Sequence, residues 1–95
     1  MRCGFRYAEG IVRVLVVEDD IGIATLQKRR LERSGYSVVI ATDAQQAEAI
    51  VAEGKVNLLV LDYHLQGTTT GLDVYEHLKA QGCNIPAILV TAFGD

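Results

Sequence analysis

Acidic side chains follow two runs of aliphatic residues in this 95-residue chain. The stretch VLVVEDD ends in Glu18, Asp19 and Asp20, and the stretch VNLLVLD ends in Asp62. Carboxylates that lie a few ångströms apart repel one another, which raises their pKa values and lowers stability unless a cation is bound. Carboxylate oxygens, a backbone carbonyl and water suit Mg²⁺, which also engages phosphate groups. The pattern therefore predicts a magnesium site.

Each of these residues also has an ordinary structural interpretation. Asp20 is most simply a helix N-cap, and an Asp after a strand, such as Asp62, is commonly a turn residue. Zinc is not expected, because His64 and His77 are single and far apart and no Cys stands at ligand spacing. The structural interpretation does not explain why the acids and Thr91 coincide at the carboxyl ends of expected strands, where sites form in open parallel sheets.

The elements that must position these residues alternate between strand and helix patterns. Short runs rich in Val, Ile and Leu are followed by segments of about ten to fifteen residues with helical spacing, which is typical of βα units. This alternation predicts an α/β fold with a parallel sheet. Strands are expected over 12–17, 36–41, 56–62 and 85–90, and helices are expected between them, ending near Gly35, Gly54 and Gly82.

Caps and apolar positions define the helices more closely. Asp20 and Asp43 are expected to cap the first and second helices. The apolar positions of the first helix include Ile23, Leu26 and Leu31, and the third helix is expected to bury Leu72, Tyr75 and Leu78 in the core.

Composition and charge limit the classes of function. The length allows one domain, expected over residues 11–95 after a lead-in over 1–10. A net charge of −3 argues against direct nucleic-acid binding. No apolar run approaches the ~18 residues of a membrane span, and the first residues have no signal-peptide core. We therefore expect a cytoplasmic protein in which Cys3 and Cys83 are reduced.

These segments resemble the receiver domain of two-component response regulators and hybrid sensor kinases. VLVVEDD is similar to that family's first strand and acidic pair, LLVLDYHL to its third strand with the phosphoacceptor Asp, and PAILVTAFGD to its fourth strand with the switch hydroxyl. The similarity covers residues 12–95. It implies a flavodoxin-like fold, with helices on both faces of a parallel sheet of strand order 2-1-3-4.

The resemblance also implies a role for each site residue. Asp62 would accept a phosphoryl group from the phosphohistidine of a sensor histidine kinase, as in bacterial phosphorelay signalling, without acting as a turnover enzyme. Asp19 would bind Mg²⁺ directly and Glu18 would bind it through water. The remaining roles fall to the backbone carbonyl of His64 as a metal ligand, the hydroxyl of Thr91 as a partner of the phosphoryl oxygen, and Ala92 as the small residue that leaves the site accessible.

The chain departs from the family pattern in two places. Gln66 replaces the usual Pro after the third strand. Family members continue beyond the position of Asp95 with a helix, a fifth strand that carries a Lys, and a last helix; Lys55 and Lys79 stand at the far ends of their elements and cannot replace that Lys. The resemblance thus implies a receiver lacking the fifth strand and last helices, with slow or unstable phosphorylation and a homodimer through the exposed fourth strand or helical faces.

Two rival functions remain open. A pseudo-receiver would act as a phosphate-independent interaction module, and a haloacid-dehalogenase-like phosphohydrolase would use Asp62 as its nucleophile, although the second acid such enzymes want is replaced by His64. The basic stretch QKRRLER is either a solvated helix face or, as the family suggests, a docking surface for the kinase.

Overall fold

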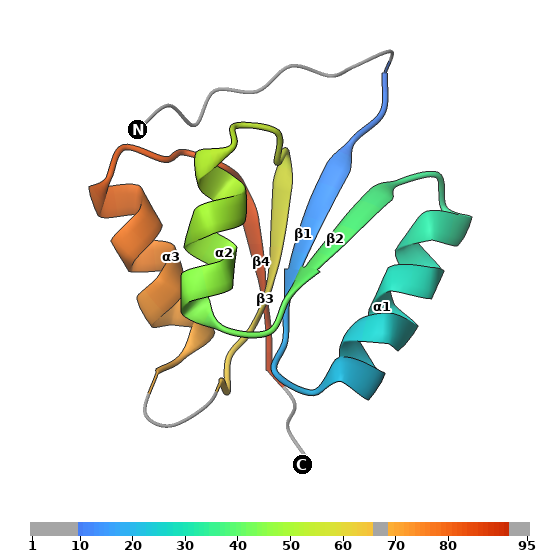
Figure 1. The fold of residues 1–95 in the computed structure, drawn as a ribbon, viewed down its shortest axis with the longest axis horizontal. Coiled ribbons are helices and arrows are strands. Elements are labelled where there is room, and N and C mark those ends of the chain that lie inside the picture. Colours follow the sequence, from blue (N-terminus) through green and yellow to red (C-terminus); the bar gives the residue numbers. More distant parts are fainter. Residues whose placement is uncertain (1–9, 66–68, 92–95) are drawn as a thin grey trace.

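The computed structural model describes residues 10–65 and 69–91, in which strands and helices alternate strictly (Figure 1). Except for Gly10, the expected lead-in lies outside these residues. The strands are β1 (Arg13–Val17), β2 (Ser37–Ala41), β3 (Leu58–Asp62) and β4 (Ala87–Val90). The helices are α1 (Ile21–Arg33), α2 (Ala44–Ala52) and α3 (Gly71–Ala80).

The strands of the described residues form one parallel sheet in the order β2-β1-β3-β4. β1 is central, with Val14 opposite Val38 of β2 and Leu58 of β3, and β4 pairs with β3. The predicted α/β class and strand order are therefore confirmed. Each strand begins one or two residues later than predicted but ends where predicted, because the polar residues that follow each apolar run mark its carboxyl end.

Helices cover both faces of the sheet, with α1 on one face and α2 and α3 on the other (Figure 1). Side chains of successive strand residues point to opposite faces. Leu15 of β1 belongs to the larger apolar cluster with Val51 of α2 and Leu78 of α3, whereas the next residue, Val16, belongs to the smaller cluster with Ala24 of α1. The nearly continuous apolar run of β1 is thus explained by burial on both sides.

The predicted helix caps are present. The side chain of Asp20 accepts hydrogen bonds from the backbone N–H groups of Gly22 and Ile23 at 2.9 and 3.1 Å. Asp43 accepts one from the N–H of Gln46 at 2.8 Å. A cap of this kind contributes about 1 kcal/mol to stability. Each helix ends two residues before one of the predicted glycines, all of which have positive φ: Gly35, Gly54 and Gly82.

Several apolar residues of the helices are more exposed than their spacing suggests. Ile23 and Leu26 of α1 are 48% and 50% exposed, and Ala24 is the residue of this helix that is fully buried. Leu72 of α3 is 41% exposed, so its predicted place in the core is wrong. Helical spacing identifies apolar positions, but it does not show whether another element covers them.

Cys83 follows α3 and is buried. Its side chain is disulfide-bonded, so the prediction of a reduced thiol is wrong for this residue. Cys3 lies outside the described residues. Within residues 10–65 and 69–91, no helix is long and apolar enough to cross a membrane.

Candidate functional site

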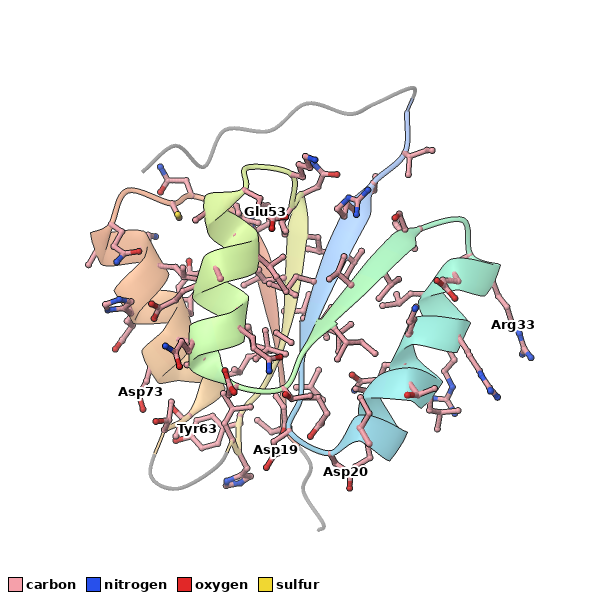
Figure 2. The ribbon with its side chains drawn as sticks, viewed as in Figure 1. Asp19, Asp20, Arg33, Glu53, Tyr63 and Asp73 are labelled. Atoms are coloured by element: carbon pink, nitrogen blue, oxygen red, sulfur yellow. The ribbon has the colours of Figure 1, made fainter. Side chains whose placement is uncertain are left out.

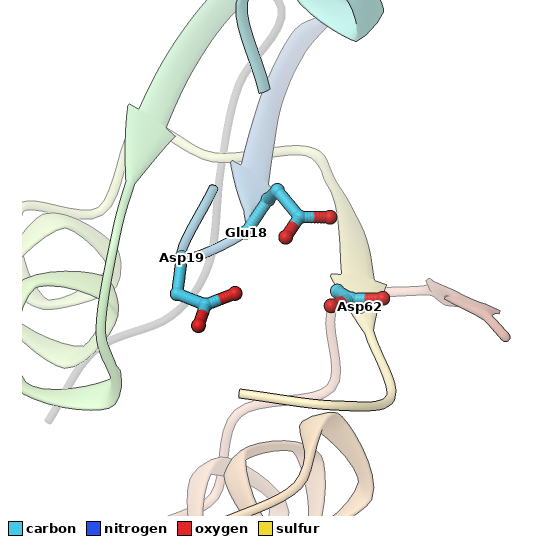
Figure 3. A group of neighbouring side chains, drawn as sticks. All are labelled: Glu18, Asp19 and Asp62. Carbon is cyan, nitrogen blue, oxygen red and sulfur yellow. The ribbon is translucent and has the colours of Figure 1, made fainter. Parts of the chain in front are cut away.

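Three carboxylates gather where the adjacent strands β1 and β3 end (Figure 3). Glu18 and Asp19 directly follow β1, and Asp62 is the last residue of β3. One ligand oxygen from each residue lies within 4.8 Å of the other two. Figure 2 shows Asp19 at the same end of the sheet as Tyr63 and opposite to Glu53. The parallel arrangement therefore brings together residues that are more than forty positions apart in the chain.

Hydrogen bonds with main-chain groups hold Glu18 in the cluster and hold the side chain of Asp20 at the start of α1. The N–H of Glu18 donates to the carbonyl of Ala41 at 3.0 Å, which extends the pairing of β1 and β2 past the strand end. The carboxylate of Glu18 accepts a hydrogen bond from the N–H of Asp20 at 3.2 Å. Because the Asp20 side chain caps α1 and is exposed, it takes no part in the carboxylate cluster.

Burial makes the charges of this cluster costly. Glu18 is 5% exposed and Asp62 is 9% exposed. Burial raises the pKa of Glu18 to about 7, and the neighbouring charges of Asp62 and Asp19 add to this effect, while the hydrogen bond from Asp20 opposes it. Burial also raises the pKa of Asp62, although a hydrogen bond with Glu18 works in the other direction. Without a bound cation, the cluster would therefore hold part of a proton at neutral pH.

The cluster has the chemistry of a site for a hard divalent cation. Its donors are all carboxylate oxygens from Glu18, Asp19 and Asp62, and Mg²⁺ is usually bound by one or two carboxylates together with waters. The raised pKa values of Glu18 and Asp62 show that negative charge is under-compensated here. A bound cation would remove this imbalance, so the residues fit the Mg²⁺ that their pattern predicts.

His64 contributes to the site in a way that the sequence did not indicate. It follows β3 and forms an isolated antiparallel bridge with Thr70. Its exposed ring lies edge-on to the ring of Tyr63, with the centroids 5.0 Å apart. The charge of His64 and a hydrogen bond from its backbone both lower the pKa of Asp62. The imidazole, to which no role was assigned, is therefore close enough to act on the central carboxylate.

The other predicted site residues lie on or beyond β4. Val90, the last residue of β4, is opposite Asp62 in the sheet, and the N–H of Tyr63 donates to its carbonyl at 2.8 Å. Thr91 directly follows Val90 and is exposed at the same carboxyl end of the sheet. Ala92 lies outside the described residues. The roles predicted for Thr91 and Ala92 remain predictions.

Comparison with known proteins connects this geometry to a family. The model of the response regulator receiver domain matches residues 14–95. This chain belongs to that family. A receiver domain is a signalling domain of two-component systems rather than a turnover enzyme, which agrees with the predicted class of function.

Curated relatives of this receiver domain are bacterial. It is 38% identical over 80 residues to the alkaline phosphatase synthesis transcriptional regulatory protein PhoP of Bacillus subtilis, covering 84% of this chain and 33% of that protein. It is 36% identical over 81 residues to the response regulator MprA of Mycobacterium bovis, covering 85% and 35%. The chain therefore spans about a third of the length of these relatives.

Solved structures of receiver domains have the same fold. The response regulator TrrA of Thermotoga maritima, solved in complex with Mg²⁺ and BeF, is 28% identical, with a TM-score of 0.80 over 88% of this chain and 72% of that one. The CheY-like receiver domain of Methanospirillum hungatei is 30% identical, with a TM-score of 0.77 over 90% and 68%. These similarities confirm the receiver fold of the described residues.

The pH dependence of stability should report the cost of the buried cluster. Because the pKa of Glu18 is raised from 4.5 to about 7, the folded state keeps a proton that the unfolded chain releases. Stability is therefore lost as pH rises from about 4.5 to about 7 and stays lost above that range. In urea unfolding without metal, Glu18→Gln should leave stability at about pH 5 nearly unchanged and raise it at about pH 8 by up to roughly 3 kcal/mol.

The matched control for this experiment is Mg²⁺. A saturating concentration should stabilise the wild-type protein at about pH 8 and stabilise Glu18→Gln less, because the variant has lost one of the charges that attract the ion. A stability difference between the two proteins that stays constant between about pH 5 and pH 8 would contradict the assignment of a raised pKa to Glu18.

Proposed function

We propose that Asp62 is the phosphoacceptor of this receiver domain, that it takes a phosphoryl group from the phosphohistidine of a sensor histidine kinase, and that the transfer depends on Mg²⁺. The observation that carries the proposal is that the carboxylates of Glu18 and Asp19 lie next to that of Asp62. Asp62 ends β3, which lies between β1 and β4 in the sheet. Membership of the receiver family supports it. The TrrA structure supports the choice of ion, since that protein was solved with Mg²⁺ and BeF.

The reaction needs an accessible, ionised carboxylate more than it needs covalent machinery. An oxygen of Asp62 forms the new P–O bond as the P–N bond of the phosphohistidine breaks, and the electron pair of that bond goes to the imidazole nitrogen, which takes a proton from solvent. Positioning and electrostatic stabilisation supply most of the catalysis in such a transfer. β3 positions Asp62, its last residue, and 9% of the surface of this residue remains exposed.

The residues around Asp62 would bind the metal ion and contact the phosphoryl group. Asp19 and Asp62 would hold Mg²⁺ directly, Glu18 through water and His64 by its backbone carbonyl, and the bound ion would neutralise the charge that otherwise separates the carboxylate from an anionic phosphoryl group. Thr91 would donate its hydroxyl to a phosphoryl oxygen, and the small side chain of Ala92 would leave the site open. The product adds negative charge at the strand ends, which Thr91 can meet by moving.

Two exposed surfaces could bind partner proteins: the basic side of α1 and the outer edge of β4. Arg29 and Arg30 of α1 are exposed, while Lys28 pairs with Glu32 at 3.9 Å. These exposed arginines would steer an acidic surface of the kinase toward the domain. Within the described residues, β4 pairs with β3 alone, and its Ile88 is 53% exposed. We propose that this edge also mediates a homodimer.

Phosphorylation is expected at a single residue, Asp62. Treatment with acetyl phosphate and Mg²⁺ should add one phosphoryl group to the wild-type protein, as measured by intact mass, and should add none to Asp62→Asn or to the wild-type protein in EDTA. A phosphorylated histidine kinase used as the donor should modify the same residue. Asp20→Asn is the matched control, because Asn is an equally good cap and Asp20 lies outside the cluster.

The outcomes separate the rival functions. An Asp62→Asn protein that still gains the phosphoryl mass would disprove the assignment. A folded wild-type protein that binds Mg²⁺ but is modified by neither donor would instead be a phosphate-independent interaction module. A phosphohydrolase would release phosphate repeatedly from a small phosphate ester. A receiver domain is expected to show no such turnover.

The homodimer can be tested at the exposed edge. Sedimentation velocity at high micromolar concentration should show a dimer of the wild-type protein, and Ile88→Lys should shift it to monomer because a buried charge cannot be paired there. Ile21→Lys is the control, since Ile21 is 60% exposed but lies on α1. A wild-type monomer, or equal dimer fractions in the two variants, would argue against the edge of β4 as the interface.

A further inference from the structure

The first residue of α3 lies against the backbone of Asp62. A Cβ atom added to Gly71 would approach the carbonyl oxygen of Asp62 more closely than real Cβ atoms do. It would also lie 3.0 Å from the carbonyl carbon of Asp62 and 3.1 Å from Cδ1 of Leu89. Two of these three atoms belong to the main chain, which cannot rotate away as the end of a side chain can. Gly71 therefore fills a space that no other amino acid fits without movement.

Backbone conformation does not explain why a glycine stands at this position. Gly71 is helical, and it is absent from the glycines with positive φ. Alanine is the better helix former at such a position. The helix start is already secured by a capping box between Thr70 and Asp73, with hydrogen bonds of 2.9 and 3.2 Å. What glycine provides here is room for α3 to approach the end of β3.

Hydrogen bonds make this approach part of the frame around Asp62. The N–H of Gly71 donates to the carbonyl of Tyr63 at 2.9 Å, and the N–H of Tyr63 donates to the carbonyl of Val90 at 2.8 Å. The main chain of Tyr63, the residue that follows Asp62, is thus held by β4 through its N–H and by the first turn of α3 through its carbonyl. A displacement of α3 would be transmitted to Asp62 through both the contact and the hydrogen bond.

We propose that Gly71 is a positioning residue for Asp62: its missing side chain lets α3 hold the backbone at the end of β3 where the Asp62 carboxylate meets Glu18 and Asp19. This inference rests on the proposed function of Asp62. A reacting group misplaced by about 1 Å loses about 10²-fold in rate, so the effect of a single methyl group should be large. Leu89, the third contact, is a residue of β4 whose side chain is 41% exposed.

The test compares Gly71→Ala with Gly22→Ala. Both glycines stand in the first turn of a helix, but a Cβ at Gly22 would meet only the Asp20 side chain, at 3.2 Å. We expect both variants to fold, as judged by circular dichroism. Gly71→Ala should weaken Mg²⁺ binding about tenfold and slow modification by acetyl phosphate about 10²-fold, whereas Gly22→Ala should match the wild-type protein within about twofold.

A double variant separates positioning of Asp62 from packing against Leu89. Gly71→Ala with Leu89→Ala removes the side-chain contact and leaves the contact with the Asp62 backbone. The proposal predicts that binding and modification stay impaired in this variant. Recovery to the level of Leu89→Ala alone would overturn it, as would normal values in Gly71→Ala.

Folding and phosphorylation are controlled separately in this design. If Gly71→Ala unfolds in both backgrounds, the proposal is wrong, because a positioning role requires a folded domain with a displaced Asp62. If the wild-type protein is modified by neither acetyl phosphate nor a phosphorylated histidine kinase, the proposed function fails, and Mg²⁺ affinity alone then decides whether Gly71 sets the geometry of the cluster.

Discussion

The mutual repulsion of three carboxylates at the edge of a parallel sheet is the constraint on which the account depends. Glu18 and Asp62 are almost fully buried and face each other and Asp19 across less than 5 Å. Burial raises the pKa of Glu18 to about 7, and the neighbouring charges of Asp62 and Asp19 add to this effect, so the ionised cluster opposes folding. A divalent cation, for which the donor set of Glu18, Asp19 and Asp62 is suited, would offset this cost.

The fold brings the three carboxylates together at the carboxyl ends of β1 and β3. Because β1 and β3 are neighbours and run parallel, the residues that follow or end these strands lie close together at the carboxyl end of the sheet. Two local features shape the surroundings of the cluster: the side chain of Asp20 caps α1 instead of joining the carboxylates, and Gly71, which has no side chain, leaves room for α3 to approach the end of β3. The apolar core on the two faces of the sheet supplies the stability that the cluster removes.

Much of this arrangement could be predicted from the sequence because its signals are local. Apolar runs followed by acids marked the strand ends, Asp20 and Asp43 were identifiable as caps, and resemblance to receiver domains supplied the strand order. Other features depend on contacts between distant segments. The exposure of Ile23 and Leu72 depends on which elements cover them, and the importance of Gly71 appears only when α3 is seen against Asp62. A glycine in the first turn of an otherwise regular helix was the one available signal.

Proton release on metal binding is the decisive measurement for the buried carboxylate cluster. Calorimetric titration of Mg²⁺ into the protein, in buffers of different ionisation enthalpy, counts the protons displaced by the ion. With the pKa of Glu18 at about 7, binding at about pH 6.5 should release a large fraction of one proton, and binding at about pH 9 should release almost none. Saturable binding without proton release at the lower pH, or release that persists unchanged in Glu18→Gln, would contradict the account.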